Sequence, residues 1–367
     1  MSLLLLALLS PERIAALPAP EREAWQRYVE TSQKQAALDR DTLEAEVQAT
    51  GRPRWTPAPK GPPFSLLNKI DVAVLADTLV SFQTPTGGWS KNLDLARPRA
   101  RGQGYSAEDK WGWISTFDND AFVGPMRTLA EAYRAQGQAA HAAAFRRGLE
   151  YALAAQFPNG CWPQVYPLEG GYHDAATFND DATSGVLELL RDVARGDLGP
   201  ADETMRERAA AAVARGTDCV LAAQVVVDGK RTVWCAQHDP LTLEPVAARS
   251  YEHASLSGLE SAGLVDFLMA QDGADPRVKA AVDGAAAWLR VNAIGGYVYT
   301  DDRERIEKEG APPLWARFYE LGTNRPIFSN RDGIVLYDWC ALGEERRRGY
   351  AWYTDRPAAT LRRYDSW

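Results

Sequence analysis

The chain has 367 residues and a formal net charge of −8, and 46% of its residues are hydrophobic. This acidic balance excludes a general nucleic-acid-binding protein, since such proteins carry a broad basic face. It leaves room for a polyanionic substrate if a local cationic cleft is set in the acidic surface. No apolar run approaches the roughly 18–20 residues of a membrane helix. We therefore expect neither nucleic acid nor membrane as a partner, and we expect a monomer.

The N-terminal part is predicted to be a helical extension followed by a linker. The apolar run Leu3–Leu9 lacks a basic region before it and is a poor signal peptide, so it is either a trimmed leader or the start of an ordinary helix. Residues 11–50 predict a helix, with Ser10 as its N-cap and Pro11 at its first position. The Pro- and Gly-rich stretch that follows is typical of a linker. We place an N-terminal extension at residues 1–60 and the main domain at residues 61–367.

Beyond the linker, helical patterns alternate with glycine-rich turns, and alternating strand patterns are few and short. The short strand patterns are Val225–Val227 and Tyr297–Thr300. Helix-period apolar positions mark Leu66–Phe82, Ala121–Ala135, Ala139–Ala155, Ala182–Val193, Ala201–Ala223, Ala254–Ala270 and Pro276–Val291.

Two segments occur twice along the chain. Gln83–Trp89 matches Gln156–Trp162 as Gln-x-Pro-x-Gly-x-Trp, and Thr116–Ala121 matches Thr177–Ala182 as Thr-Phe-Asx-Asx-Asp-Ala. Repeated helix pairs of this length predict hairpins that stack around an axis and bury their apolar faces on their neighbours. We therefore predict an all-α fold, an α/α toroid of helical hairpins with long loops and a few short strands. The loops would gather at one end and form a cleft.

The two Thr-Phe-Asx-Asx-Asp-Ala segments have two interpretations. Thr, Asp and Asn favour helix N-caps, and the helix dipole stabilises acids there. Alternatively, both copies present oxygen ligands to one cleft, as Ca²⁺ requires. The side chains in question are Asp118, Asn119, Asp120, Asn179, Asp180 and Asp181.

Other polar residues near the turns are candidate ligands of an acidic substrate. Lys91 follows the first turn closely and can face a carboxylate, while Trp89 and Trp162 either pack in the core or offer a ring face to a sugar. Arg249 precedes a predicted helix start, which suits anion binding. His238 and Asp239 resemble an acid–base pair, although a hydrogen-bonded loop histidine explains the same pattern.

The segment from Pro313 to Gly333 interleaves arginines with large aromatic residues and keeps neither a helix nor a strand period. Solvated surface loops rarely carry so many aromatics. Guanidinium forks bind carboxylates and aromatic rings stack on sugars, so the segment favours an acidic carbohydrate. The arginines are Arg317, Arg325 and Arg331, and the aromatics are Trp315, Phe318, Tyr319 and Phe328.

In these motifs the chain resembles the family-10 pectate lyases, in consistent order from about Leu66 to Tyr353. The matching segments are Gly87–Asn92, Thr116–Asn119, Phe157–Gly160, Trp162–Tyr166, Thr177–Asp180, Val233–Asp239, Arg249–Glu252 and Leu314–Gly333. The resemblance implies an α/α toroid, Ca²⁺ as cofactor, and eliminative cleavage of polygalacturonate to unsaturated oligogalacturonides.

Carried over by position, Arg331 matches the proposed catalytic base of that family. Asp118, Asn119 and Asp180 match its calcium-site residues. Arg249 and Arg317 match its substrate-binding cations, and we add Lys91, Arg325, His238 and Asp239 as candidate substrate ligands. The sequence departs from the family pattern at Ser90, Asp120, Cys161 and Asp181, and the two extra acids can alter calcium affinity.

Two other classes of function fit part of the pattern. Many α/α toroids are glycoside hydrolases, and two of the Asp residues could serve as acid and base on an acidic sugar. A non-catalytic binder of acidic glycans would use the same cations. For the enzyme we expect a secreted or periplasmic location. The four cysteines lack zinc-site spacing, and both disulfides and buried free thiols remain open for Cys161, Cys219, Cys235 and Cys340.

Overall fold

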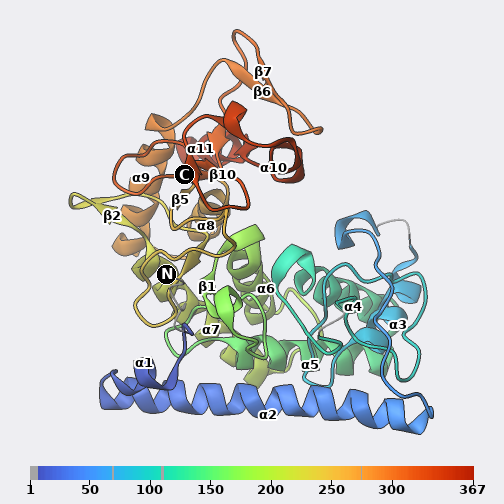
Figure 1. Cartoon of the computed structure of the whole chain (residues 1–367). Coiled ribbons are helices and arrows are strands. Elements are labelled where there is room, and N and C mark those ends of the chain that lie inside the picture. Colours follow the sequence, from blue (N-terminus) through green and yellow to red (C-terminus); the bar gives the residue numbers. More distant parts are fainter. Residues whose placement is uncertain (1–6, 68–69, 109–110, 274) are drawn as a thin grey trace. The chain divides into compact units, whose positions relative to one another are not determined.

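The computed structural model describes residues 7–67, 70–108, 111–273 and 275–367, and Figure 1 shows the course of the chain. Most of the run Leu3–Leu9 lies outside the described residues. The chain divides into two compact units. Unit 1 comprises Met1–Asp174 and Gly185–Gly216, and unit 2 comprises Ala175–Ser184 and Thr217–Trp367. Among the described residues, no helix is long and apolar enough to cross a membrane.

Unit 1 is built from helices joined by long loops. Its helices are α1 (Pro11–Ala15), α2 (Ala19–Ala49), α3 (Val72–Phe82), α4 (Val123–Gln136) and α5 (Ala139–Ala155), together with most of α6 (Ala182–Arg195) and α7 (Glu203–Ala223). Helices α3, α4 and α5 pack on one another, and their buried side chains are mostly alanine, larger aliphatic residues and a few aromatics. The predicted helix Ala139–Ala155 has the bounds that its apolar period indicated.

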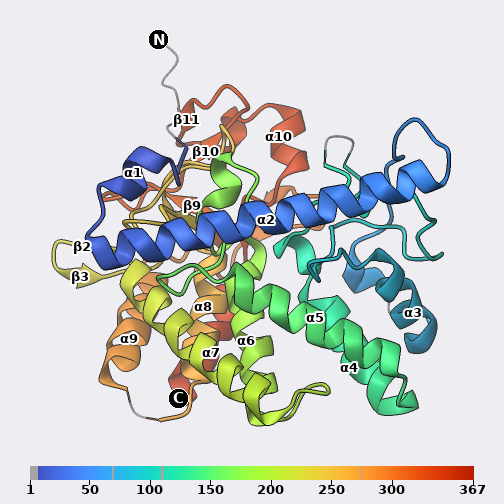
Figure 2. The same cartoon turned by 90° about the horizontal axis from the view of Figure 1, so that it is seen from below.

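The predicted helix over residues 11–50 is split into α1 and α2. The chain leaves the helix after Ala15 and re-enters it at Ala19, where Pro18 and Pro20 lack the N–H donors that a continuous helix requires. Figures 1 and 2 show α2 alongside α5. The Tyr28 hydroxyl donates to the Ala155 carbonyl oxygen over 2.9 Å. The N-terminal helix thus belongs to the packing of unit 1, and a domain boundary near residue 60 stays a prediction.

The Gln-x-Pro-x-Gly-x-Trp turns tie neighbouring hairpins together. The Gln83 amide donates to Gly87 in its own turn and to Ala144 on α5, and the Gln156 amide does the same with Gly160 and Ala212. A Cβ on Gly87 would lie 2.3 Å from the Arg147 carbonyl oxygen, so the close approach of turn and helix needs glycine.

A third copy of this device lies in unit 2 and escaped the sequence comparison. The Gln224 amide donates to the carbonyl oxygens of Thr232 and Ala281, and Trp234 is buried as Trp89 and Trp162 are. The two-stranded pair β2 (Val226–Val227) and β3 (Lys230–Arg231) is inserted between the glutamine and the tryptophan. This insertion changes the spacing and hides the repeat.

Unit 2 combines packed helices with long loops held by short antiparallel strand pairs. Its helices α8 (Glu260–Met269), α9 (Pro276–Val291) and α11 (Arg356–Ser366) pack together, and α10 (Glu344–Gly349) lies in the loop region. The strand pairs other than β2–β3 are β1 (Ala176–Thr177) with β4 (Gln237–His238), β5 (Leu256–Ser257) with β9 (Phe318–Tyr319), β6 (Tyr297–Tyr299) with β7 (Arg305–Glu307), β8 (Trp315–Ala316) with β12 (Tyr353–Thr354), and β10 (Phe328–Ser329) with β11 (Val335–Leu336).

Two predicted helix starts are wrong. The helix predicted from Ala254 begins at Glu260, because Leu256 and Ser257 pair with β9 and the Ser257 hydroxyl accepts from the Glu260 amide. The helix predicted from Leu66 begins at Val72, where Asp71 supplies the N-cap. Of the cysteines left open above, Cys161 and Cys219 are disulfide-bonded, whereas Cys235 and Cys340 are free.

Candidate functional site

The two Thr-Phe-Asx-Asx-Asp-Ala segments form the same unusual turn. Asn119 and Asp120 have φ values of 53° and 56°, and Asp180 and Asp181 have φ values of 48° and 60°. Asn and Asp tolerate this left-handed conformation better than other side chains, yet it still costs free energy and often marks functional sites. In the first segment, the Asp120 carboxylate accepts a hydrogen bond from the Gly124 amide near the start of α4, as a helix cap does. Both interpretations of the segments, helix caps and metal ligands, therefore stay open.

The first turn lies in unit 1 and pairs a buried acid with a lysine. Asp118 is 3% exposed, and one of its carboxylate oxygens forms a short ion pair with the ammonium group of Lys91. Asn119 and Asp120 are exposed, and Asp120 accepts a hydrogen bond from the Gly124 amide. Lys91, predicted to bind substrate, thus contacts a predicted calcium-site residue.

The second turn lies in unit 2 and is held by a buried arginine. One terminal nitrogen of Arg317 donates to Asn179 Oδ1 over 3.0 Å, to Asp180 Oδ1 over 2.9 Å and to Glu260 Oε1 over 2.6 Å. Burial opposes the charge of Arg317, but Glu260, Tyr350 and Asp180 raise its pKa well above the ordinary value. Arg317 is therefore a permanent cation that fixes this turn.

Four arginines of unit 2 converge on two tyrosines, and we name this set the arginine–tyrosine cluster. The rings of Tyr251 and Tyr350 meet edge to face at 5.3 Å. Guanidinium carbons lie within cation–π distance of these rings. For Tyr251 the distances are 4.6 Å from Arg346, 5.0 Å from Arg249 and 5.8 Å from Arg331. For Tyr350 they are 4.8 Å from Arg317 and 5.6 Å from Arg249.

The arginines of the cluster differ in exposure. The side chains of Arg249 and Arg331 are 44% and 64% exposed, whereas Arg317 and Arg346 are buried. Only the first two can present a guanidinium to a ligand without rearrangement. The cluster thus offers two accessible cations backed by two buried ones, which suits a substrate with several carboxylates.

Acidic partners hold the two accessible cations. Arg249 Nε donates to buried Glu252 over 2.7 Å, and Glu252 also accepts from the Tyr350 hydroxyl. Burial opposes the charge of Arg249, and Glu252 nevertheless raises its pKa above the ordinary value. Arg331 donates to exposed Glu345 over 2.8 Å. The guanidinium groups of Arg346 and Arg331 lower the pKa of Glu345 to about 2.

Several interpretations of the sequence are corrected here. The aromatics expected to stack on a sugar are core residues, because the strands that carry them pair with β5, β11 and β12. Each is at most 2% exposed: Trp315, Phe318, Tyr319 and Phe328. Trp89 and Trp162 are likewise buried. Arg249 does not stand at a helix start, since α8 begins at Glu260.

The pair His238 and Asp239 is reassigned to a structural role. His238 is fully buried, its Nδ1 contacts the Leu243 carbonyl oxygen, and its Nε2 accepts from the Cys235 amide. Burial lowers the pKa of His238 to about 4. Asp239 accepts hydrogen bonds from the amides of Leu241 and Thr242. Both side chains hold a loop together, and their predicted binding to substrate stays a prediction.

Arg325, in contrast, is exposed. Its guanidinium lies 3.7 Å from the centre of the exposed Tyr337 ring. In the part of the chain that the structure describes, Arg325 has no ion pair. It remains a candidate ligand of a carboxylate.

The predicted calcium ligands fit the metal in kind. Asp118, Asn119 and Asp180 offer carboxylate and amide oxygens, the donors that Ca²⁺ prefers. Across residues 7–67, 70–108, 111–273 and 275–367, no group of three or more His, Cys, Asp or Glu forms a ready-made metal site. Asp118 and Asn119 belong to unit 1 and Asp180 belongs to unit 2, so a single metal site formed by all three stays a prediction.

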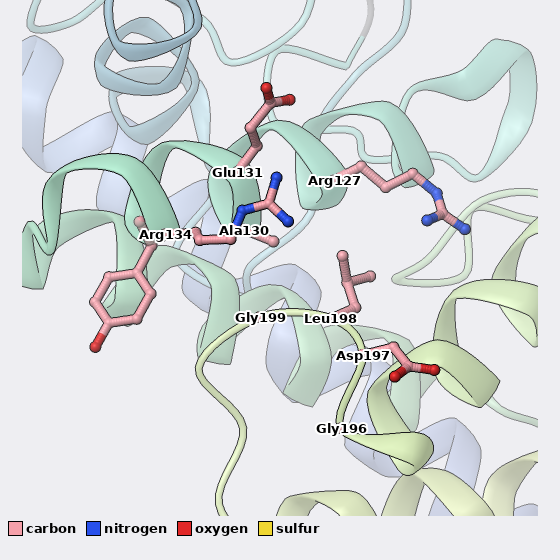
Figure 3. Close-up of a pocket in the computed structure, with 9 residues that line it drawn as sticks. Arg127, Ala130, Glu131, Arg134, Gly196, Asp197, Leu198 and Gly199 are labelled. Atoms are coloured by element: carbon pink, nitrogen blue, oxygen red, sulfur yellow. The ribbon is translucent and has the colours of Figure 1, made fainter.

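A hollow in unit 1 is a weaker candidate. Its volume is about 420 Å³, and it lies between α4 and residues 196–199. Figure 3 shows Arg127 and Arg134 on α4 and Asp197 on the neighbouring loop, with Glu131 pointing away from that loop. Arg127 is already paired with Asp192 over 2.8 Å. None of the predicted site residues lines this hollow, and its charges largely offset one another.

Sequence reasoning missed the residues that hold the site residues in place. These are Tyr251, Glu252, Glu260, Arg346, Tyr350 and Arg356. Tyr251 and Glu252 lie within the quoted segment Arg249–Glu252, which was the one available signal. The others are distant in sequence and only the folded chain brings them together.

Comparison with known proteins gives matches over most of the chain. A family model described as pectic acid lyase matches residues 83–361. Two solved structures of a family 10 polysaccharide lyase from Cellvibrio cellulosa, one of them a mutant in complex with trigalacturonic acid, are 35% identical and superpose with a TM-score of 0.74. They cover 83% of this chain, which covers 95% and 94% of theirs. The comparison with curated proteins gave no match. The predicted fold class, an all-α fold of the α/α-toroid type, is confirmed.

Proposed function

The chain belongs to the pectic acid lyase family and is a pectate lyase, and from this premise we propose that it cleaves polygalacturonate by calcium-dependent β-elimination with an arginine as base. The observation that carries the proposal is the arginine–tyrosine cluster. It gathers four cations in an acidic chain, which suits a substrate with one carboxylate per sugar.

The chemistry explains why cations are needed. Elimination removes the proton on C5, which is α to the C6 carboxylate, and the bond to O4 breaks as the C4=C5 double bond forms. A carboxylate acidifies its α-proton poorly, so positive groups must stabilise the negative charge that develops on it. Exposed Arg249, backed by buried Arg317, can supply this stabilisation.

We propose Arg331 as the base. It is the more exposed of the two accessible guanidinium groups in the cluster, and its acidic partner Glu345 is also exposed, so substrate can displace that contact. Arg249 is the alternative, but buried Glu252 raises its pKa, which favours a binding role. Free arginine is protonated at neutral pH, so an arginine base predicts activity that rises in alkaline solution.

On the family resemblance we propose Asp118, Asn119 and Asp180 as calcium ligands, and calcium would supply positive charge next to the substrate carboxylate. Lys91 pairs with Asp118, and Arg317 pairs with Asp180. These contacts support the view that both turns are built to face positive charge.

One assay separates this proposal from its alternatives. Purified protein is incubated with polygalacturonate in calcium or in chelator, and ultraviolet absorbance of the unsaturated product is followed. We expect absorbance to rise with calcium and not with chelator. New reducing ends without absorbance would indicate hydrolysis by paired acids, and binding without fragments would indicate a non-catalytic glycan-binding protein.

Lysine substitutions then assign the arginines. Arg331→Lys should lower kcat by about 10²–10⁴-fold with little change in KM, because the base is lost, whereas Arg249→Lys should mainly raise KM. Arg348→Lys, at an exposed arginine paired with Glu304, is the matched control. Near-normal turnover of Arg331→Lys, with kcat lost in Arg249→Lys, would transfer the base role to Arg249.

We further propose a monomer that acts outside the cytosol. The disulfide-bonded state of Cys161 and Cys219 supports an oxidising compartment. Fractionation of producing cells and light scattering of the purified protein test these two proposals. Protein confined to the cytosolic fraction, or a dimer in solution, would contradict them.

A further inference from the structure

The second left-handed turn is held by a second arginine that the mechanism does not use. Asp181 Oδ2 forms an ion pair with Arg356 Nη1 over 2.5 Å, and Asp181 Oδ1 accepts from the Ser184 hydroxyl over 3.3 Å. Arg356 is the first residue of α11 and is distant in sequence from the turn. The acid that departs from the family pattern therefore has a specific partner.

Helix α8 leaves room for this ion pair. A Cβ on Gly263 would lie 2.3 Å from Asp181 Oδ1 and 2.9 Å from Arg356 Nη2. A side chain at this position would require the carboxylate and the guanidinium to shift. The pair thus lies in a notch of α8 at Gly263, where the close approach of both side-chain ends uses the absence of a Cβ.

Two arginines from different segments consequently hold two successive residues. Arg317 forms an ion pair with Asp180, and Arg356 forms an ion pair with Asp181. The first turn differs, since Asp120 accepts only a backbone hydrogen bond and has no ion pair among the described residues. The second turn is therefore the more firmly fixed of the two.

We propose that Arg356 is a positioning residue of the calcium site: it holds the Asp181 carboxylate in the α8 notch and so fixes the left-handed turn that carries Asp180, which Arg317 also contacts. The inference rests on the proposed calcium dependence. Partners that orient metal ligands typically contribute about 10–100-fold to metal affinity. Arg356 would orient Asp180 indirectly, because it holds the adjacent residue Asp181.

The test measures calcium affinity by two readouts. The first is the rise in Tm with calcium in the presence of trigalacturonate, and the second is the calcium dependence of the lyase rate. Arg356→Gln should raise the calcium concentration for half-maximal effect by roughly 10-fold or more in both, with kcat at saturating calcium nearly unchanged. Arg356→Lys should restore part of the affinity. The control is Arg363→Gln, at another arginine of α11, which removes an ion pair with Asp266 on α8. This variant should leave the calcium affinity unchanged.

The outcomes that overturn the proposal are distinct. Tighter calcium binding by Arg356→Gln would mean that Arg356 withholds a ligand, and unchanged binding would mean that it positions nothing. Asp181→Asn checks the same point if Arg356→Gln fails to fold, since the proposal expects this variant to bind calcium more weakly, and unchanged binding would contradict it. A wild-type protein without any calcium effect on Tm or rate would refute the calcium proposal itself, and this inference with it.

Discussion

The buried ion pair of Arg317 offers the sharpest test of how the site is held together. Arg317→Met keeps much of the side-chain volume but removes the guanidinium that donates to Asn179, Asp180 and Glu260. Glu260 is 1% exposed and would remain as a buried carboxylate without its cation. Removing one member of a buried pair typically costs about 3–5 kcal/mol, because the other charge stays desolvated.

This cost is a large share of the roughly 5–15 kcal/mol by which domains are stable. It should appear in urea unfolding as a lower midpoint with an unchanged slope. Adding Glu260→Leu to Arg317→Met removes the stranded charge and should restore part of the loss. The matched control is Arg346→Met, at a buried arginine whose partner Glu345 is exposed, so water can solvate the carboxylate that remains.

A free energy of unfolding for Arg317→Met within about 0.5 kcal/mol of the wild-type value would refute this reasoning. So would a double variant whose loss equals the sum of the two single losses, because that result would mean that Arg317 and Glu260 do not interact. Lyase activity should fall in Arg317→Met under conditions where the protein is still folded, since the turn that presents Asp180 loses its support.

Two further predictions concern pH and substrate binding. Asp39 on α2 is fully buried and accepts from the Thr86 amide and hydroxyl, and burial raises its pKa from 3.8 to about 7. Because folding raises this pKa, the stability that Asp39 contributes is complete below about pH 4 and is lost as pH rises through about 7. Asp39→Asn should flatten the Tm profile and add up to roughly 4 kcal/mol of stability above pH 7; an unchanged profile would contradict the assignment. Arg325→Gln should raise KM for polygalacturonate several-fold with kcat retained, because its unpaired guanidinium on Tyr337 can bind a carboxylate. Arg362→Gln, an exposed arginine on α11, is the charge-matched control, and equal KM values for the two variants would exclude the site.

Much of the fold follows from local sequence. The helix over Pro276–Val291 has its predicted bounds because an N-cap aspartate, a proline at the first position and a regular apolar period all act within a few residues. The repeated glutamine turns likewise announced hairpins that stack on one another. The third glutamine turn could not be recognised from the sequence, because the inserted strand pair β2–β3 changes the spacing between Gln224 and Trp234.

Which residues of the candidate site face a ligand was decided by tertiary structure. The segment that ends at Gly333 reads as alternating arginines and aromatics, but its pairing with β5, β11 and β12 buries the aromatics and Arg317 and leaves Arg325 and Arg331 outside. The residue types alone therefore predicted the chemistry, in which arginines bind the carboxylates of an acidic sugar. The role of each arginine depends on burial and on distant acids such as Glu260, and no local pattern encodes contacts made across so many residues of chain.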